Sequence, residues 1–185
     1  MTLFEYLSAA HTLILTFALT RALSGAADAI RPGRRYWVHL SWLGLGVAFC
    51  LFAFWALWSY VAVEWTINRF IGLLAVPALI YVYSSIVIPS DPSSVESWRK
   101  YYFEKRLPLF GTGVLLMAAI IYSNQFILGV APMQSSQVTL YGALAMFSIG
   151  LFATSPRLHA VLAIGPVIFF TLTLLEFAHP GSMAQ

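Results

Sequence analysis

Six apolar stretches, separated by short polar segments, occupy most of the chain. Most of them are about 20 residues long, which is the length that carries an α-helix across the hydrocarbon of a bilayer. Only helices and closed barrels satisfy every backbone group in hydrocarbon, so the pattern predicts an all-α integral membrane protein, a bundle of about six transmembrane helices. The predicted spans cover residues 3–22, 36–63, 67–89, 109–128, 138–153 and 158–177.

The fifth stretch is the shortest, and its length would also suit a re-entrant or interfacial segment. Pro132 before it and Pro156 after it are typical of helix ends, which favours a full span. Two other prolines, Pro77 and Pro166, fall inside spans three and six. We expect kinks there, and the broken helices of transporters are the alternative.

Composition agrees with the membrane prediction. Sixty per cent of the residues are hydrophobic and 9% are charged, which excludes a soluble fold. Six spans leave no room for a separate soluble domain, so residues 1–185 are expected to form a single polytopic domain. The net charge is +3, but the basic residues lie beside the spans, so we do not expect nucleic acid as a partner.

Basic residues gather in the odd-numbered connections between spans. The even-numbered connections contain only Arg69. By the positive-inside rule, both termini are expected on the non-cytoplasmic side, in what we take to be a bacterial inner membrane. The basic residues are Arg31, Arg34 and Arg35 in the first connection, with Arg21 just inside span one, Arg99, Lys100, Lys105 and Arg106 in the third, and Arg157 in the fifth.

The third connection is the longest polar segment. An aspartate cap followed by Pro92 predicts a short amphipathic helix over about residues 92–107. Val95, Trp98 and Tyr102 share one face of it, so the helix is expected to lie along the cytoplasmic membrane surface, as a linker, a gate or a docking element. The residues expected to contact lipid headgroups or a partner are Trp98, Arg99, Lys100, Lys105 and Arg106.

Span one has the most polar residues. Hydroxyl side chains recur at every fourth position, with Glu5 one turn above them and His11 beside them. This face is expected to point into the bundle, where it could line a water-filled path or bind an ion. Ser and Thr also bond to their own helix carbonyls and permit close helix packing, which is the alternative. The hydroxyl residues are Ser8, Thr12, Thr16 and Thr20.

Four ionisable residues fall near the predicted outer side: Glu5 and His11 in span one, and Glu176 and His179 at the end of span six. If the two helices are neighbours, these residues could form a divalent-metal or proton-exchanging cluster. Such residues can equally reach interfacial water, and the second copy of the motif used by di-iron bundles is missing. We therefore predict no metal site and no cofactor.

Catalytic motifs are absent from the sequence: it has no phosphate-binding glycine-rich loop, no HExxH, no CxxC and no serine elbow. An enzyme is therefore disfavoured. The expected function is an oligomeric channel or transporter-like protein with a polar path along the first helix. The alternatives are a non-catalytic accessory or scaffold subunit of a membrane complex and, third, an intramembrane enzyme or redox protein. Small residues that favour a homo-oligomer or a larger complex are Gly46, Cys50, Gly111, Gly113, Gly150 and Thr154.

Overall fold

The computed structural model describes residues 2–177, and it contains helices and no strand within that range. Six helical units in this range are long and apolar enough to cross a membrane. The predicted all-α membrane bundle is therefore confirmed. The six units are Leu3–Ala29, Trp37–Tyr60, Ile67–Ser94, Arg106–Ile127, Ser135–Phe152 and Pro156–Leu175.

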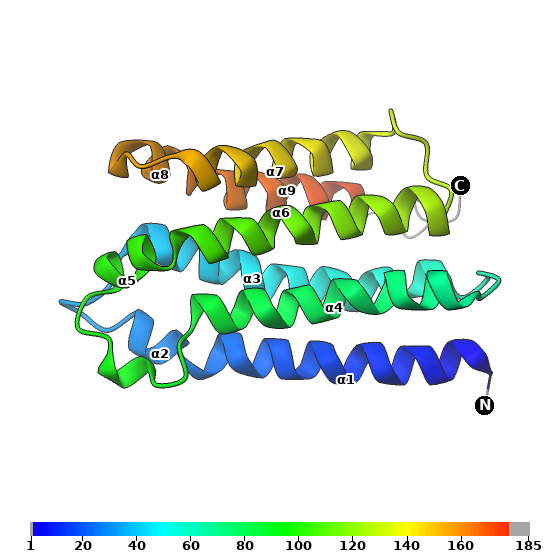
Figure 1. Cartoon of the computed structure of the whole chain (residues 1–185), viewed down its shortest axis with the longest axis horizontal. Helices are drawn as coiled ribbons and strands as arrows, with labels where there is room; N and C mark the ends of the chain where they lie inside the picture. Colours follow the sequence, from blue (N-terminus) through cyan, green and yellow to red (C-terminus); the bar gives the residue numbers. More distant parts are fainter. Residues whose placement is uncertain (1, 178–185) are drawn as a thin grey trace.

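Several of these units combine more than one helical element (Figure 1). The elements are α1 (Leu3–Ser24), α2 (Ala26–Ala29), α3 (Trp37–Ala56), η1 (Leu57–Tyr60), α4 (Ile67–Val87), η2 (Pro92–Ser94), α5 (Trp98–Glu104), α6 (Arg106–Tyr122), the π-helical η3 (Ser123–Ile127), α7 (Ser135–Phe152), α8 (Pro156–Leu162) and α9 (Gly165–Phe177).

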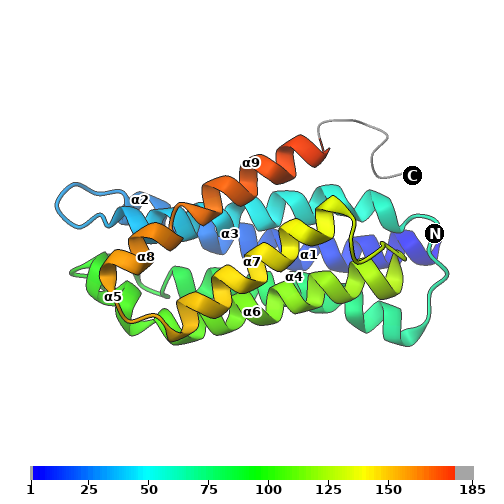
Figure 2. The same ribbon diagram turned by 90° about the horizontal axis from the view of Figure 1, so that it is seen from above.

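The helices pack in a continuous series. Helix α1 contacts α3 and α4, α4 contacts α6, α6 contacts α7, and α9 contacts α3 and α7. Helices α7 and α9 run side by side and are inclined to the other long helices (Figure 2). The first and last long helices thus both pack on α3, which lies between them in the series.

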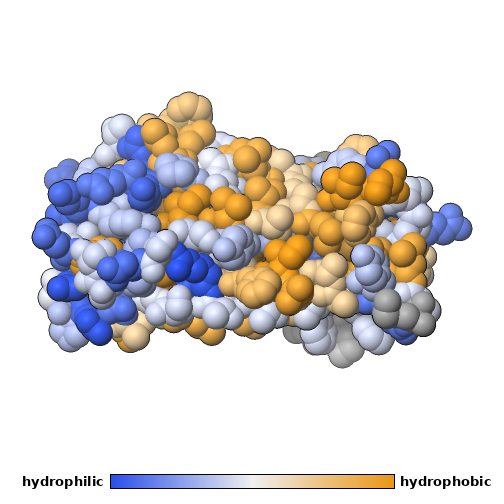
Figure 3. Space-filling model, turned by 60° about the horizontal axis from the view of Figure 1, so that its bottom comes forward, coloured by the Kyte–Doolittle hydropathy of each residue, from blue (hydrophilic) through white to orange (hydrophobic). Residues whose placement is uncertain are grey.

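The two ends of the bundle differ in charge. One end, called the basic end below, carries α2, η2, α5 and the start of α8, and every Lys and Arg except Arg69 lies there. The other, called the terminal end, carries the start of α1 and the end of α9. On the face shown in Figure 3, hydrophilic side chains gather at the basic end, and apolar side chains cover much of the remainder.

The structure changes the predicted boundaries of the fifth and sixth spans. The fifth is one continuous helix, α7, that begins at Ser135 instead of residue 138, and its 18 residues suffice for a span. The sixth is broken between α8 and α9. Pro166 follows the break, and the Val167 N–H bonds to the Ile164 carbonyl at 3.1 Å instead of continuing the i→i−4 ladder. The Ala163 carbonyl then accepts a hydrogen bond from Ser41 of α3.

A reciprocal packing of phenylalanines on glycines joins α6 to α7. The Phe147 ring lies directly over Gly113, and the Phe110 ring lies directly over Gly150, so each helix contributes one ring and one glycine. The two ring centroids are 6.0 Å apart. In the same way, the Tyr83 ring lies over Gly46. These three glycines serve packing within the chain, and association into an oligomer stays a prediction.

The third connection differs from its predicted arrangement. The helix there is α5, residues 98–104, and not a helix over 92–107; Ser97 caps it by accepting a hydrogen bond from the Lys100 N–H. The side chains of Trp98 and Tyr102 are 0% and 1% exposed, so their face packs on the protein and not on the membrane surface. The predicted contact of Trp98 with lipid headgroups or a partner is therefore wrong, because its side chain has no exposed surface. The other four residues named for headgroup contact keep that role as a prediction: Arg99, Lys100 and Lys105 are exposed, and Arg106 is half-buried.

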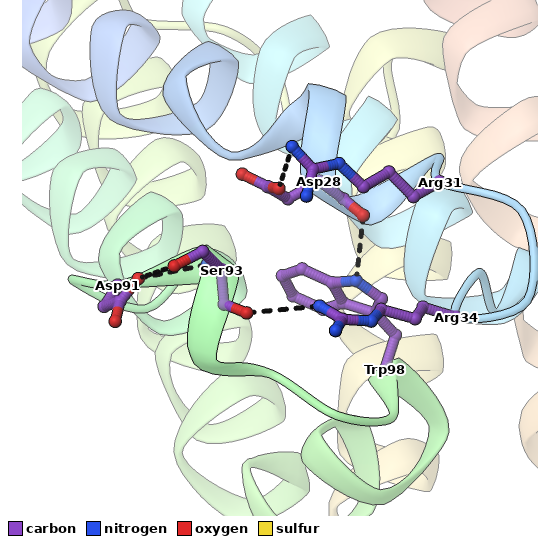
Figure 4. A network of polar contacts seen from close by, with 6 residues as sticks. All are labelled: Asp28, Arg31, Arg34, Asp91, Ser93 and Trp98. Carbon is purple, nitrogen blue, oxygen red and sulfur yellow. Dashed lines mark hydrogen bonds and ion pairs between the residues drawn. The ribbon is translucent and has the colours of Figure 1, made fainter.

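Polar contacts bind the third connection to the first (Figure 4). The Trp98 indole N–H donates to the Asp28 carbonyl at 3.2 Å, and the Arg34 guanidinium donates to the Ser93 carbonyl at 3.1 Å. Arg31 pairs with the Asp28 carboxylate at 3.1 Å. The basic end is thus a folded cap built from two connections that are far apart in the sequence.

Candidate functional site

The hydroxyl face of α1 does not point into the bundle. Ser8 and Thr12 are half-buried, and Thr16 and Thr20 are exposed. Two of the hydroxyls are satisfied within the helix, since Ser8 donates to the Phe4 carbonyl at 2.7 Å and Thr16 to the Thr12 carbonyl at 2.9 Å. The predicted inward orientation of this face is therefore wrong. The hydrogen bonds within the helix lower the free-energy cost of exposing these hydroxyls to lipid. The inward face consists of Leu7, His11, Leu15, Ala18 and Ala22.

His11 is the one polar side chain on that inward face. It is 2% exposed, and its Nδ1 atom has no hydrogen-bond partner among the described residues. A buried nitrogen without a partner costs free energy, about 1–3 kcal/mol, unless something binds it. The sequence singled out His11 for a polar path, and the structure places it in the wall of a cavity.

The cavity lies in the terminal half of the bundle and has a volume of about 140 Å³. Helices α1, α3, α4, α6, α7 and α9 all contribute to it, together with η1 and η3. Its walls are mainly apolar, and none of the described lining residues is an Asp, Glu, Lys or Arg. The apolar lining residues are Phe49, Phe52, Ala53, Ala56, Leu73, Val76, Ile80, Ile120, Leu140 and Phe169, and the polar ones are His11, Tyr60, Ser123, Asn124, Ser136, Thr139 and Thr173.

The π-helical segment η3 supplies two of the polar lining residues. The Leu128 N–H bonds to the Ser123 carbonyl, which is the i→i−5 pattern of a π-helix, and Gly129 ends the segment with a φ of 70°. Ser123 and Asn124 both line the cavity. The segment follows α6 directly and ends it, as π-turns commonly do at helix C-termini. The sequence analysis does not single out Asn124, because no local pattern marks a π segment.

Aromatic side chains fill the bundle between the cavity and the basic end. Trp42, Tyr83, Phe110 and Phe147 are each 0% exposed. The Trp42 ring centroid lies 4.8 Å from that of Phe110 and 5.4 Å from that of Phe147. Tyr83 donates its hydroxyl to the Trp42 carbonyl at 3.0 Å. The packed rings close the cavity toward the basic end.

A second buried polar cluster lies at the basic end. His159 uses both ring nitrogens: Nδ1 is 2.8 Å from the Tyr102 hydroxyl, and Nε2 is 3.1 Å from the Ala153 carbonyl. A carbonyl only accepts, so Nε2 carries the proton and Nδ1 accepts from Tyr102. Burial raises the pKa of Tyr102, which keeps its hydroxyl protonated as that donor. His39 stacks on Trp98 with centroids 4.7 Å apart. This arrangement joins α3, α5 and α8.

The structure tests little of the predicted ionisable cluster. Glu5 forms a capping box with Thr2 at the start of α1: its carboxylate accepts from the Thr2 N–H at 2.7 Å. Glu176 belongs to the last turn of α9, but its side chain lies outside the described residues, as does the whole of His179. Among the residues that are described, no three His, Cys, Asp or Glu side chains come together in a way that could hold a metal ion.

Comparison with known proteins gives no match. No protein-family model, no curated protein and no solved structure is similar to this chain. The functional assignment therefore depends on the site itself.

Proposed function

We propose that this polytopic membrane protein is transporter-like and binds a small neutral molecule in the cavity beside His11. The observation that supports this most directly is the unpartnered Nδ1 atom of a buried histidine in the wall of an otherwise mostly apolar cavity. Apolar walls with a few convergent polar groups are typical of small-molecule sites. A volume of about 140 Å³ suits a single ring, since an engineered apolar cavity of about 150 Å³ binds benzene.

The lining favours a neutral ligand over an ion. Ion sites in membranes use charged side chains or rings of backbone carbonyls, and no charged side chain is found among the described lining residues. A continuous water path along α1 has less support, because Thr16 and Thr20 are exposed and the aromatic rings close the cavity toward the basic end. Binding is thus better supported than conduction through a single chain.

Photolabelling of the cavity tests this proposal. In lipid discs, a phenol that carries a small diazirine is expected to label cavity residues of α3 and α9, and excess phenol should suppress the labelling. His11→Phe keeps a ring of similar size but removes both nitrogens, so we expect the affinity for phenol to fall about three- to tenfold, as for the loss of one buried hydrogen bond.

The matched control is Thr16→Leu, on the same helix but exposed. It should leave phenol binding unchanged, whereas a polar path along α1 would make it the more damaging variant. If the wild-type cavity shows no labelling that phenol suppresses, the binding proposal is wrong, and the accessory-subunit interpretation takes its place.

We also propose that the basic end faces the cytoplasm, on the strength of the positive-inside rule. After Cys50→Ala removes the one cysteine, single cysteines can replace Ser93 at the basic end and Ser135 at the terminal end, both of which are exposed. An impermeant thiol reagent applied to intact cells should label position 135 and spare position 93. The opposite labelling pattern would reverse the orientation.

A further inference from the structure

A larger hollow lies on the outside of the bundle, between α7 and α9. It is a groove of about 630 Å³, and its described lining is almost wholly apolar. Gly142 and Met146 contribute from α7, and Ile168 and Leu172 contribute from α9. The two inclined helices that form it stand side by side in Figure 2. Both belong to membrane-spanning units, so the groove opens toward the acyl chains of the bilayer.

The groove adjoins the cavity. Thr139 of α7 and Phe169 of α9 line both of them, so these two side chains form the wall that the hollows share. Phe169 is 8% exposed, and its ring packs on that of Phe49 with centroids 5.9 Å apart. The cavity beside His11 and the groove between α7 and α9 thus share one wall.

We infer that the ligand is a ring-headed lipid, a single ring bearing an oxygen substituent with one apolar tail, which reaches the cavity sideways from the bilayer between α7 and α9. This inference rests on the proposed function. The ring occupies the cavity of about 140 Å³ beside His11, and the tail passes Thr139 and Phe169 and lies in the groove of about 630 Å³.

The shapes and surfaces of the two hollows support this occupant over a water-soluble one. The polar groups lie in the cavity beside His11, whereas the larger groove offers an apolar surface to a hydrocarbon tail. Ligand sites typically measure about 300–1,000 Å³, a range that the cavity alone does not reach and that the groove and cavity together do. A molecule dissolved in the membrane meets the groove directly, without crossing the closed aromatic packing of the basic half.

Two photoprobes test the inference, one with the diazirine on the ring of a decylphenol and one with it at the end of the decyl tail. The ring probe is expected to label the cavity, and the tail probe to label groove residues such as Met146 and Ile168. Unlabelled decylphenol should suppress both. A decyl chain without the ring should suppress neither, because it lacks the group that binds beside His11.

Gly142→Phe is the variant that tests whether the tail lies in the groove. A Cβ at Gly142 meets no atom within 4 Å, so the new ring can extend into the groove without straining the helix. We expect it to abolish labelling by the tail probe and to weaken competition by decylphenol about tenfold, while tail-less phenol competes as before. Gly44→Phe is the matched control: its Cβ also meets nothing within 4 Å, and it lies in a separate hollow between α3 and α9.

The possible failures are distinct. If the ring probe labels the cavity but the tail probe labels sites outside the groove, or if Gly142→Phe behaves like Gly44→Phe, sideways access is wrong and the binding proposal stands. Equal suppression of the tail probe by the ring-less decyl chain would make the groove a site for ordinary acyl chains, which also overturns the inference. If the ring probe fails to label the cavity, both proposals are wrong.

Discussion

Trp98→Ala is expected to lower the free energy of unfolding by about 3–5 kcal/mol, the usual cost of deleting a large buried aromatic side chain. The indole is 0% exposed, stacks on His39 and donates its N–H to the Asp28 carbonyl at 3.2 Å. Its loss would leave a void beneath α5 and remove a hydrogen bond between the first and third connections. Unfolding of the purified protein in mild detergent, followed by tryptophan-independent far-UV circular dichroism, measures the change.

Two neighbours on α5 provide the control. Arg99 and Lys100 are exposed, so their alanine variants should change the stability by no more than about 0.5 kcal/mol. A third variant, Trp98→Phe, keeps much of the packing but removes the donor, and it should fall between these limits. If Trp98→Ala were as mild as Arg99→Ala, the helix would have to lie on the membrane surface after all.

The error over α5 has a physical cause. An apolar face at helical spacing has the same sequence whether it is buried against lipid or against protein, and the basic residues beside it fit both situations. The decisive contact joins Trp98 to Asp28, which is 70 positions away along the chain. No local pattern indicates which distant connection will fold over such a face.

The inward face of α1 was misjudged for a related reason. In water, hydroxyl residues mark the exposed face of a helix and apolar residues mark the core, but lipid is as apolar as the core and removes that contrast. Ser8 and Thr16 bond to their own helix, so facing lipid costs them little. His11 cannot satisfy both ring nitrogens in this way, and it is the polar residue of α1 that the structure buries.

The spans themselves were predictable, because hydrocarbon thickness and backbone satisfaction act on each segment separately. The cavity was not predictable, since it depends on how six helices align in depth and on the π segment at Ser123 and Asn124. Likewise, Thr139 and Phe169 form a wall between the cavity and the groove only because α7 packs against α9.

Because α6 packs closely on α7, replacing glycine by alanine is expected to have opposite effects on stability at two nearby positions of α6. A Cβ at Gly113 would lie 2.1 Å from the Phe147 ring. This ring is 0% exposed, so the atoms packed around it prevent it from moving away. Gly113→Ala should therefore destabilise the protein by about 1–3 kcal/mol through overpacking. A Cβ at Gly111 would meet only the end of the Leu151 side chain, at 3.9 Å. Gly111→Ala should therefore be neutral or stabilising by up to about 1 kcal/mol, the usual gain of alanine over glycine within a helix.

Midpoints of thermal unfolding in the same detergent would compare these two variants directly. Because both substitutions add one methyl group to the same turn of α6, differences in helix propensity or expression cannot explain opposite signs. A combined Gly113→Ala and Phe147→Leu variant should recover part of the loss, because the smaller side chain makes room for the added methyl group. Equal stability of the two single variants would mean that Phe147 does not lie over Gly113, and the reciprocal packing of α6 on α7 would have to be abandoned.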